Sequence, residues 1–312
     1  MKARSIKPFS VFCEFVPEGQ PVALLVSAKP AHWTKNLLIF AALVFSGGLL
    51  KYYLLTHCIL GFGLFCIASS GVYIANDLFD RKKDRIHPLK QYRPIAAGLI
   101  DPTTALVWAI MLQAIALIGA FLLSEAFGYI LLAYLLLNVA YNLLFKKIVL
   151  LDVFCVAFSL LLRAFAGATL ACAPMSLWLI GCTLSLGLFM SFAKRRNEQK
   201  LLGAKAAAHR QSLKWYKTGR LDWFVYASAT TVVIFYTIYS FASETALVIA
   251  NGHMALTIPF VLFGVMRLFS LLDRDNQLSD PTRLVIKDRL LLINNLLWVI
   301  SVILIIYGQF IL

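Results

Sequence analysis

The feature that most constrains this chain is a series of long apolar runs separated by short polar segments. A helix needs about 20 mostly apolar residues to cross the hydrocarbon core of a bilayer. Backbone polar groups in lipid must be satisfied within the segment, so such runs are typical of membrane-spanning helices. The sequence predicts an all-α integral membrane protein with nine spans, at residues 35–50, 54–76, 103–123, 126–144, 149–170, 175–193, 222–242, 246–272 and 288–311.

Composition supports this class. Hydrophobic residues make up 61% of the 312 residues and charged residues 14%, whereas a soluble domain is about half apolar and a quarter charged. We therefore expect one transmembrane domain over residues 28–312, with residues 1–27 as a cytoplasmic tail on the membrane surface. The net charge of +14 does not indicate nucleic-acid binding, because the basic residues lie in loops between the apolar runs.

The distribution of basic residues predicts the orientation of the chain. The region up to residue 35 contains five Lys or Arg residues, the loop from 81 to 93 contains six, and the loop from 194 to 220 contains nine. The opposite connections contain only Lys51. Because loops rich in Lys and Arg stay in the cytoplasm, we expect a cytoplasmic N-terminus and an external C-terminus. The protein is then a multi-pass protein of the cell inner (plasma) membrane, with its active site facing the cytoplasm.

Three carboxylates mark the end of the second predicted span. Asp77, Asp80 and Asp84 follow one another at i, i+3 and i+7, so they share one face of a helix. Three acids on one face repel each other unless a cation lies among them, and Mg²⁺ prefers oxygen ligands that include substrate phosphates. The alternative is a solvated helix end, where the acids pair with the neighbouring basic residues 81–83. Their position at the mouth of a membrane helix favours the metal-diphosphate site.

Other polar groups lie on the same predicted side of the membrane. Lys29 precedes the first span and Lys35 lies at its start, where they could also anchor the chain in lipid headgroups. The sixth span ends in a run containing Lys194, Arg195 and Glu198, which is equally typical of a cytoplasmic stop. Arg163 lies inside the fifth span and is costly there. It must therefore face the bundle interior, either as a structural tie or as a substrate contact.

The chain resembles the UbiA-type polyprenyltransferase superfamily. Residues 76–84 match its first Asp-rich motif, N-D-x-x-D-x-x-x-D, and the predicted helix number and Tyr141…Lys146-Lys147 agree with it. The usual second motif, D-x-x-x-D, is replaced by Lys194-Arg195-Arg196-Asn197-Glu198. This more closely resembles the decaprenyl-phosphate phosphoribosyltransferase branch, with further agreement in residues 29–36, 87–98, 162–167 and 259–267.

The resemblance implies an Mg²⁺-dependent enzyme that moves 5-phosphoribose from phosphoribosyl diphosphate to a polyprenyl phosphate, for cell-envelope polysaccharide precursors. Asp77, Asp80 and Asp84 are the expected catalytic metal ligands. The donor-binding residues are expected to be Asn76, Arg85, Lys90, Arg93, Tyr141, Lys194, Arg195 and Glu198. Lys29, Lys35 and Lys146 are the candidates for the acceptor phosphate. The replacement of the second motif's acids by Lys and Arg is consistent with substrates that together carry several phosphate groups. Arg can bind a phosphate through two parallel hydrogen bonds.

Two alternatives remain open. The chain could be a UbiA-type prenyltransferase that moves a polyprenyl group from its diphosphate to an aromatic or other acceptor, although the missing second acids argue against it. It could also be a transporter, for which Arg163 is the best support. Against that, the polar groups cluster at one face and no inverted repeat is evident. The sequence is compatible with a homo-oligomer and indicates no nucleic-acid partner.

Overall fold

The computed structural model describes residues 19–203, 211–216, 218–242, 250–274 and 281–311, and every regular element in these ranges is a helix. The all-α prediction is therefore confirmed for this part of the chain. Within these ranges, eight helices are long and apolar enough to cross a membrane, as expected of an integral membrane protein. They cover Tyr52–Asp84, Pro102–Leu123, Glu125–Leu143, Leu151–Leu170, Leu177–Leu202, Gly219–Phe241, His253–Asp273 and Arg289–Gly308.

The first of the nine predicted spans, residues 35–50, is not a continuous helix. It is divided among the 3₁₀ helix η1 (Pro30–Leu38), the short helix α2 (Ile39–Phe45) and the 3₁₀ helix η2 (Gly48–Leu50). Gly47 has a φ of 73° and separates α2 from η2, a conformation that glycine adopts without steric cost. The count of nine spans is therefore not confirmed in the described ranges, and the cytoplasmic N-terminus stays a prediction.

Two helices continue well beyond the predicted membrane boundary. Helix α3 (Tyr52–Asp84) extends past residue 76 through the acidic motif, and α8 (Leu177–Leu202) extends past residue 193 through the basic run. Hydropathy detects where a helix leaves the lipid, but hydrogen bonding along the backbone continues in water. Both charged motifs therefore lie on helices. Of the predicted N-terminal tail, residues 1–18 lie outside the described ranges, and residues 20–27 belong to α1 (Gln20–Ala28).

The chain divides into two compact units. The first comprises Met1–Pro30 and Cys66–Ala116, and the second comprises Ala31–Phe65 and Leu117–Leu312. Helices α3 and α5 (Pro102–Leu123) each contribute residues to both units.

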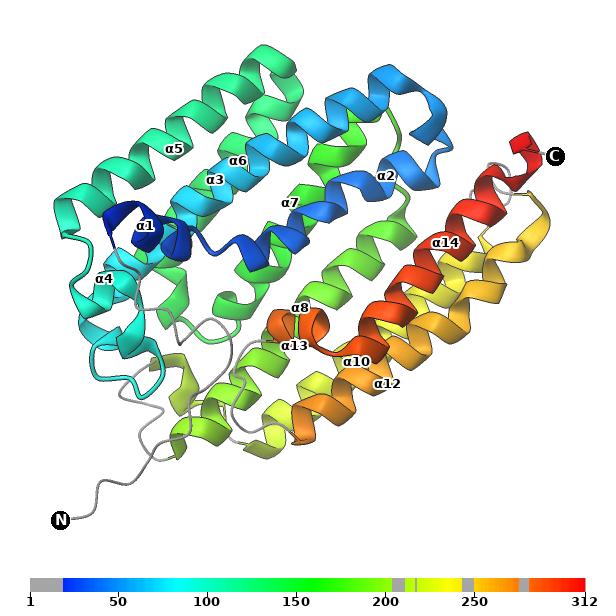
Figure 1. The fold of residues 1–312 in the computed structure, drawn as a ribbon. Coiled ribbons are helices and arrows are strands. Elements are labelled where there is room, and N and C mark those ends of the chain that lie inside the picture. The colour runs from blue at the N-terminus through cyan, green and yellow to red at the C-terminus, as the bar shows by residue number, and fades with distance from the viewer. Residues whose placement is uncertain (1–18, 204–210, 217, 243–249, 275–280, 312) are drawn as a thin grey trace. The chain divides into compact units, whose positions relative to one another are not determined.

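In the first unit, α1 packs against the short helix α4 (Pro94–Ala97), which follows the 3₁₀ helix η3 (Lys90–Tyr92) (Figure 1). Asp101 caps the start of α5, because its carboxylate accepts hydrogen bonds from the backbone N–H groups of Thr103 and Thr104. The hydroxyl of Thr104 also donates to it, and these bonds hold the pKa of Asp101 below its usual value. The apolar core of this unit consists of Ala23, Ile74, Ile95, Ile100, Ala105 and Ala109.

In the second unit, α7 (Leu151–Leu170) packs against α2, α6 (Glu125–Leu143) and α8, and α8 also packs along α10 (Thr218–Phe241). Helices α12 (Ile258–Arg274) and α14 (Arg289–Ile311) lie side by side (Figure 1). The remaining elements are short: η4 (Phe145–Lys147), η6 (Gln211–Lys214), η7 (Ala250–Thr257) and α13 (Pro281–Lys287).

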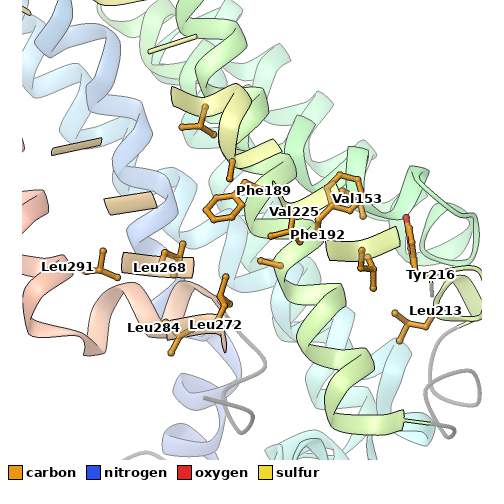
Figure 2. Packing of buried hydrophobic residues seen from close by; sticks show 14 residues of the cluster. Val153, Phe189, Phe192, Leu213, Tyr216, Val225, Leu268, Leu272, Leu284 and Leu291 are labelled. Carbon is orange, nitrogen blue, oxygen red and sulfur yellow. The ribbon is translucent and has the colours of Figure 1, made fainter. Parts of the chain in front are cut away.

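A buried cluster joins seven of these elements. Figure 2 shows Val153 of α7, Phe192 of α8, Val225 of α10 and Leu268 of α12 in one apolar core. Phe192 also stacks on Phe224, with ring centroids 4.9 Å apart. Leu213 of η6 belongs to the same core, so this short segment after α8 is packed against the helices.

Helix α7 approaches α2 so closely that no side chain fits between them. A Cβ atom added to Gly167 would lie 2.0 Å from the backbone oxygen of Ile39. Such a distance requires movement of one backbone or the other. The close packing of α2 on α7 therefore depends on this glycine.

Candidate functional site

The acidic cluster, Asp77, Asp80 and Asp84, lies on the last two turns of α3 as the spacing predicted. Asp77 is 1% exposed and Asp84 5% exposed, so two of the three carboxylates are withdrawn from water. Buried carboxylates are costly unless cations or hydrogen bonds accompany them. The structure provides two cations from elsewhere in the first unit.

Arg93 bridges two of the acids. Its Nη1 atom lies 2.8 Å from Oδ1 of Asp77 and 2.8 Å from Oδ2 of Asp84. Burial alone would lower the pKa of Arg93, but the carboxylates of Asp77 and Asp84 more than offset this effect, so its pKa is raised. Arg93 was predicted to bind the donor, and its guanidinium is held at the acidic cluster.

Lys29 supplies the second cation. It ends α1 with a φ of 53°, and its Nζ atom donates to Oδ1 of Asp77 at 2.7 Å. The same ammonium lies 5.5 Å from the centroid of the Tyr73 ring, a favourable cation–π distance. Lys29 was predicted to be a ligand of the acceptor phosphate, but the structure places it on a predicted metal ligand.

The carboxylates suit a hard cation only in part. Oδ2 of Asp77 is buried and has no hydrogen-bond partner among the described residues, so it is available as an anionic ligand. No three His, Cys, Asp or Glu side chains in the described ranges are grouped closely enough to hold a metal ion. Mg²⁺ is usually held by one or two carboxylates together with substrate phosphates and water. The cluster fits that kind of site, and the assignment of all three acids as ligands stays a prediction.

The loop after α3 is ordered by its own side chains. His87 is buried, and its Nδ1 atom accepts hydrogen bonds from the backbone N–H groups of Leu89 and Lys90 at 3.1 and 3.3 Å. Arg85, predicted to bind the donor, donates from Nε to the backbone oxygen of Ala96 at 3.0 Å. Part of its guanidinium therefore stabilises the end of α4. Lys90 and Asn76 are half-buried in this unit.

The second unit contains a different polar group, which we call the arginine cluster: Arg195, Asp152, Glu198, Tyr141, Ser212 and Tyr216. Arg195 is 2% exposed, and its Nε atom donates to Oδ2 of Asp152 at 2.9 Å. Its Nη1 atom donates to Oε2 of Glu198 at 2.8 Å, and Nη2 lies 3.4 Å from the hydroxyl of Tyr141. Three predicted donor ligands, Tyr141, Arg195 and Glu198, are thus brought together.

Asp152 is the centre of the arginine cluster, and it was not among the predicted site residues. It is fully buried and also accepts hydrogen bonds from Ser212 and from Tyr216, both at 3.0 Å. Burial and the charge of Asp152 raise the pKa of the Tyr216 phenol. Ser212 and Tyr216 lie after α8 in a segment that the sequence does not mark. No spacing rule relates them to residue 152, because they are 60 and 64 residues away.

The neighbouring Arg196 has a structural role. It forms an ion pair with Asp222 of α10, and its Nη1 atom lies 2.7 Å from Oδ1 of Asp273 in α12. This arginine therefore ties α8 to two other helices. Lys194, Lys35 and Lys146 are half-buried, and the structure does not test their predicted substrate contacts.

Arg163, the residue left open by the sequence, is a structural tie within the second unit. It is 3% exposed, and its Nε atom donates to Oδ1 of Asn36 at 2.7 Å. Its Nη2 atom donates to the hydroxyl of Tyr134 at 3.0 Å, and its Nη1 atom donates to the backbone oxygen of Ser159. The guanidinium thereby joins η1, α6 and α7.

A cavity of about 580 Å³ lies at the other end of α7 from Asp152. It is lined by residues of α2, by the α7–α8 connection and by Lys51 and Tyr239. None of the predicted site residues lines it. The candidate functional groups are therefore the acidic cluster of the first unit and the arginine cluster of the second unit, and not this cavity.

Comparisons with known proteins identify the family of this chain. The profile of the UbiA prenyltransferase family matches residues 36–296. The decaprenyl-phosphate phosphoribosyltransferase of Mycobacterium tuberculosis is 31% identical over 292 residues, which cover 92% of this chain and 95% of that protein. The protein of the same name from Mycolicibacterium smegmatis is 30% identical, with 91% and 92% covered.

Solved structures support the fold. A UbiA homolog from Archaeoglobus fulgidus bound to GPP and Mg²⁺ matches with a TM-score of 0.69 over 91% of this chain and 99% of that chain. The two sequences are 19% identical, so this likeness concerns the arrangement of helices alone.

Proposed function

Because the chain belongs to the UbiA prenyltransferase family, we propose that it is a membrane phosphoribosyltransferase. It would transfer 5-phosphoribose from phosphoribosyl diphosphate to a polyprenyl phosphate of the decaprenyl type. The main support is 31% identity to a decaprenyl-phosphate phosphoribosyltransferase over nearly the whole length of both chains. Buried and half-buried Lys and Arg side chains lie near the carboxylates, which is consistent with substrates that carry several phosphates.

The reaction exchanges one bond to the anomeric carbon for another. An oxygen of the polyprenyl phosphate forms the new bond, and the bond to the diphosphate breaks, so that diphosphate leaves with the electron pair. The attacking phosphate is already anionic, so no side chain has to remove a proton. The residues then have two tasks, to hold the reacting groups in line and to stabilise negative charge on the leaving group.

The acidic cluster is proposed to hold Mg²⁺ through Asp77, Asp80 and Asp84, with Asn76 beside them on α3. Bound there, Mg²⁺ would neutralise charge on the departing diphosphate. Arg93 would hold Asp77 and Asp84 in place through its bridge of 2.8 Å bonds. Lys90 and the exposed part of Arg85 are proposed to contact donor phosphates.

The arginine cluster is proposed to bind the ribose-phosphate end of the donor through Lys194, Arg195 and Glu198. Asp152 fixes the guanidinium of Arg195 from one side, which leaves its orientation defined before substrate arrives. Lys35 and Lys146 are proposed ligands of the acceptor phosphate. We further propose that the reaction takes place at the cytoplasmic face of the inner membrane, as the basic loops indicate.

The proposal is tested by incubating the purified protein with ribose-labelled phosphoribosyl diphosphate, polyprenyl phosphate and Mg²⁺. We expect the label to enter the lipid fraction and the transfer to stop when EDTA is added. Asp80→Asn should reduce transfer by about 10²-fold or more, which is the scale of losing one charge-stabilising group. Glu125→Gln removes an exposed acid at the start of α6 and should leave transfer unchanged.

Two outcomes would contradict the proposal. Label that stays entirely water-soluble would exclude phosphoribosyl transfer. Transfer from a polyprenyl diphosphate to an aromatic acceptor, in the same preparation, would instead favour the prenyltransferase alternative. The transporter alternative has lost its best support, because the hydrogen bonds of Arg163 to Asn36 and Tyr134 explain that buried cation.

A further inference from the structure

Lys29 has an unusual backbone conformation for a lysine. Its φ of 53° and ψ of 62° place it in the left-handed region at the end of α1, where glycine is the usual residue. Pro30 follows directly and restricts the same residue further. A strained non-glycine residue persists where its side chain is needed, and the side chain of Lys29 reaches Asp77.

Lys29 contacts the carboxylate of Asp77, whose two oxygens differ in their hydrogen-bond partners. Oδ1 of Asp77 accepts from Lys29 at 2.7 Å and from Arg93 at 2.8 Å. Oδ2 is buried and has no hydrogen-bond partner in the described ranges. Oδ1 therefore contacts two cationic side chains, whereas Oδ2 is available to bind a third cation.

A divalent cation bound to the Asp77 carboxylate would lie close to the ammonium of Lys29, because both contact the same carboxylate. Two cations so close repel each other strongly in a site withdrawn from water. Arg93 is anchored on a second acid, Asp84, at 2.8 Å, so it is the less mobile of the two. Lys29 has a flexible four-carbon stem, and its side chain is 15% exposed.

From these contacts we infer that Lys29 is an internal counter-ion for Asp77, which exchanges partners when a metal-bound diphosphate arrives. The contact of 2.7 Å lets its ammonium neutralise Asp77 until a divalent cation binds. When the carboxylate is taken up by the divalent cation, the ammonium moves to an oxygen of the incoming diphosphate. The identity of that diphosphate as phosphoribosyl diphosphate rests on the proposed function, whereas the exchange itself does not.

The exchange has a consequence for affinity. The metal alone must displace Lys29 from Asp77 and brings no anion of its own to the ammonium, so it binds weakly. The metal together with a diphosphate provides that anion, so the two ligands support each other's binding. Lys29 therefore opposes metal binding and favours diphosphate binding, and its removal should shift the two affinities in opposite directions.

The test uses Lys29→Met in the full-length protein purified in detergent. Binding of Mn²⁺ alone is measured by the loss of the free-ion EPR signal, and binding of inorganic diphosphate in saturating Mg²⁺ by calorimetry. We expect Lys29→Met to bind Mn²⁺ about tenfold more tightly than the unmodified protein and diphosphate about tenfold more weakly. Lys83→Met removes an exposed positive charge from the same end of α3 and should shift neither affinity comparably.

A second variant guards against loss of folding. Lys29→Gly removes the ammonium but accepts the left-handed backbone without strain, and it should show the same two opposite shifts. Equal or weaker Mn²⁺ binding in the folded variants would overturn the inference, as would unchanged diphosphate affinity. Because neither probe contains ribose or lipid, failure of the phosphoribosyl-transfer assay would leave these results unaffected, and the two failures can be told apart.

Discussion

Asp152→Asn is the substitution that most sharply tests the buried polar core of the second unit. Asp152 is fully buried and accepts hydrogen bonds from Arg195, Ser212 and Tyr216. An asparagine of the same shape removes the charge and turns one acceptor into a donor. Arg195 would then keep Glu198 as its anionic partner at 2.8 Å, but it would lose the carboxylate that contacts its Nε atom.

The expected cost follows from the burial of this pair. Removing one partner of a buried ion pair costs about 3–5 kcal/mol when the other charge is left uncompensated. Because Glu198 still compensates part of the charge, we expect a loss of about 2–4 kcal/mol. At about 2–4 °C per kcal/mol, the melting temperature should fall by roughly 4–16 °C.

The assay is thermal unfolding in detergent, followed by the intrinsic fluorescence of the tryptophans. Asp222→Asn is the matched control, because Asp222 pairs with the adjacent Arg196 but has a side chain that is 32% exposed. Partly exposed ion pairs contribute about 1 kcal/mol or less, so this variant should melt within a few degrees of the unmodified protein. An Asp152→Asn variant as stable as the Asp222→Asn variant would refute the reasoning.

Three further predictions concern packing and charge. Gly167→Ala should lower the melting temperature by several degrees, because the added methyl group would lie on the backbone oxygen of Ile39. Arg163→Met should destabilise the protein in the same assay, since its hydrogen bonds join three elements, and an unchanged melt would contradict the structural role. Hydrogen bonds from Arg267 hold the pKa of Asp288 below its ordinary value of 3.8. The stabilisation by Asp288 should therefore be complete above about pH 4 and decline as the pH falls through the lowered pKa, so the melting difference from Asp288→Asn should shrink below pH 4.

The sequence predicted the features that depend on local spacing. Eight apolar runs correspond to eight long helices, because length and hydrophobicity decide which segments cross lipid. The i, i+3, i+7 spacing placed Asp77, Asp80 and Asp84 on one helix, and α3 contains all three. The run at 35–50 was the exception, because its apolar character gave no sign of the break at Gly47.

Local sequence patterns could not predict contacts between residues that are far apart in the chain. Lys29 and Asp77 are 48 residues apart, and Arg195 and Asp152 are 43 apart. Helical spacing relates only residues within a few turns, so the contact of Lys29 with Asp77 was not predicted and Asp152 was left out of the site. The charged residue types indicated a charged site, whereas the partner of each side chain became evident only from the fold.

The central claim is tested most directly by the mass of the lipid product. Purified protein is incubated with phosphoribosyl diphosphate, Mg²⁺ and a polyprenyl phosphate of defined length, and the lipid is examined by mass spectrometry. The account predicts a polyprenyl phosphate heavier by one phosphoribosyl group, with one diphosphate released for each lipid converted. A lipid of unchanged mass, from a preparation that is folded and binds Mn²⁺, would contradict it.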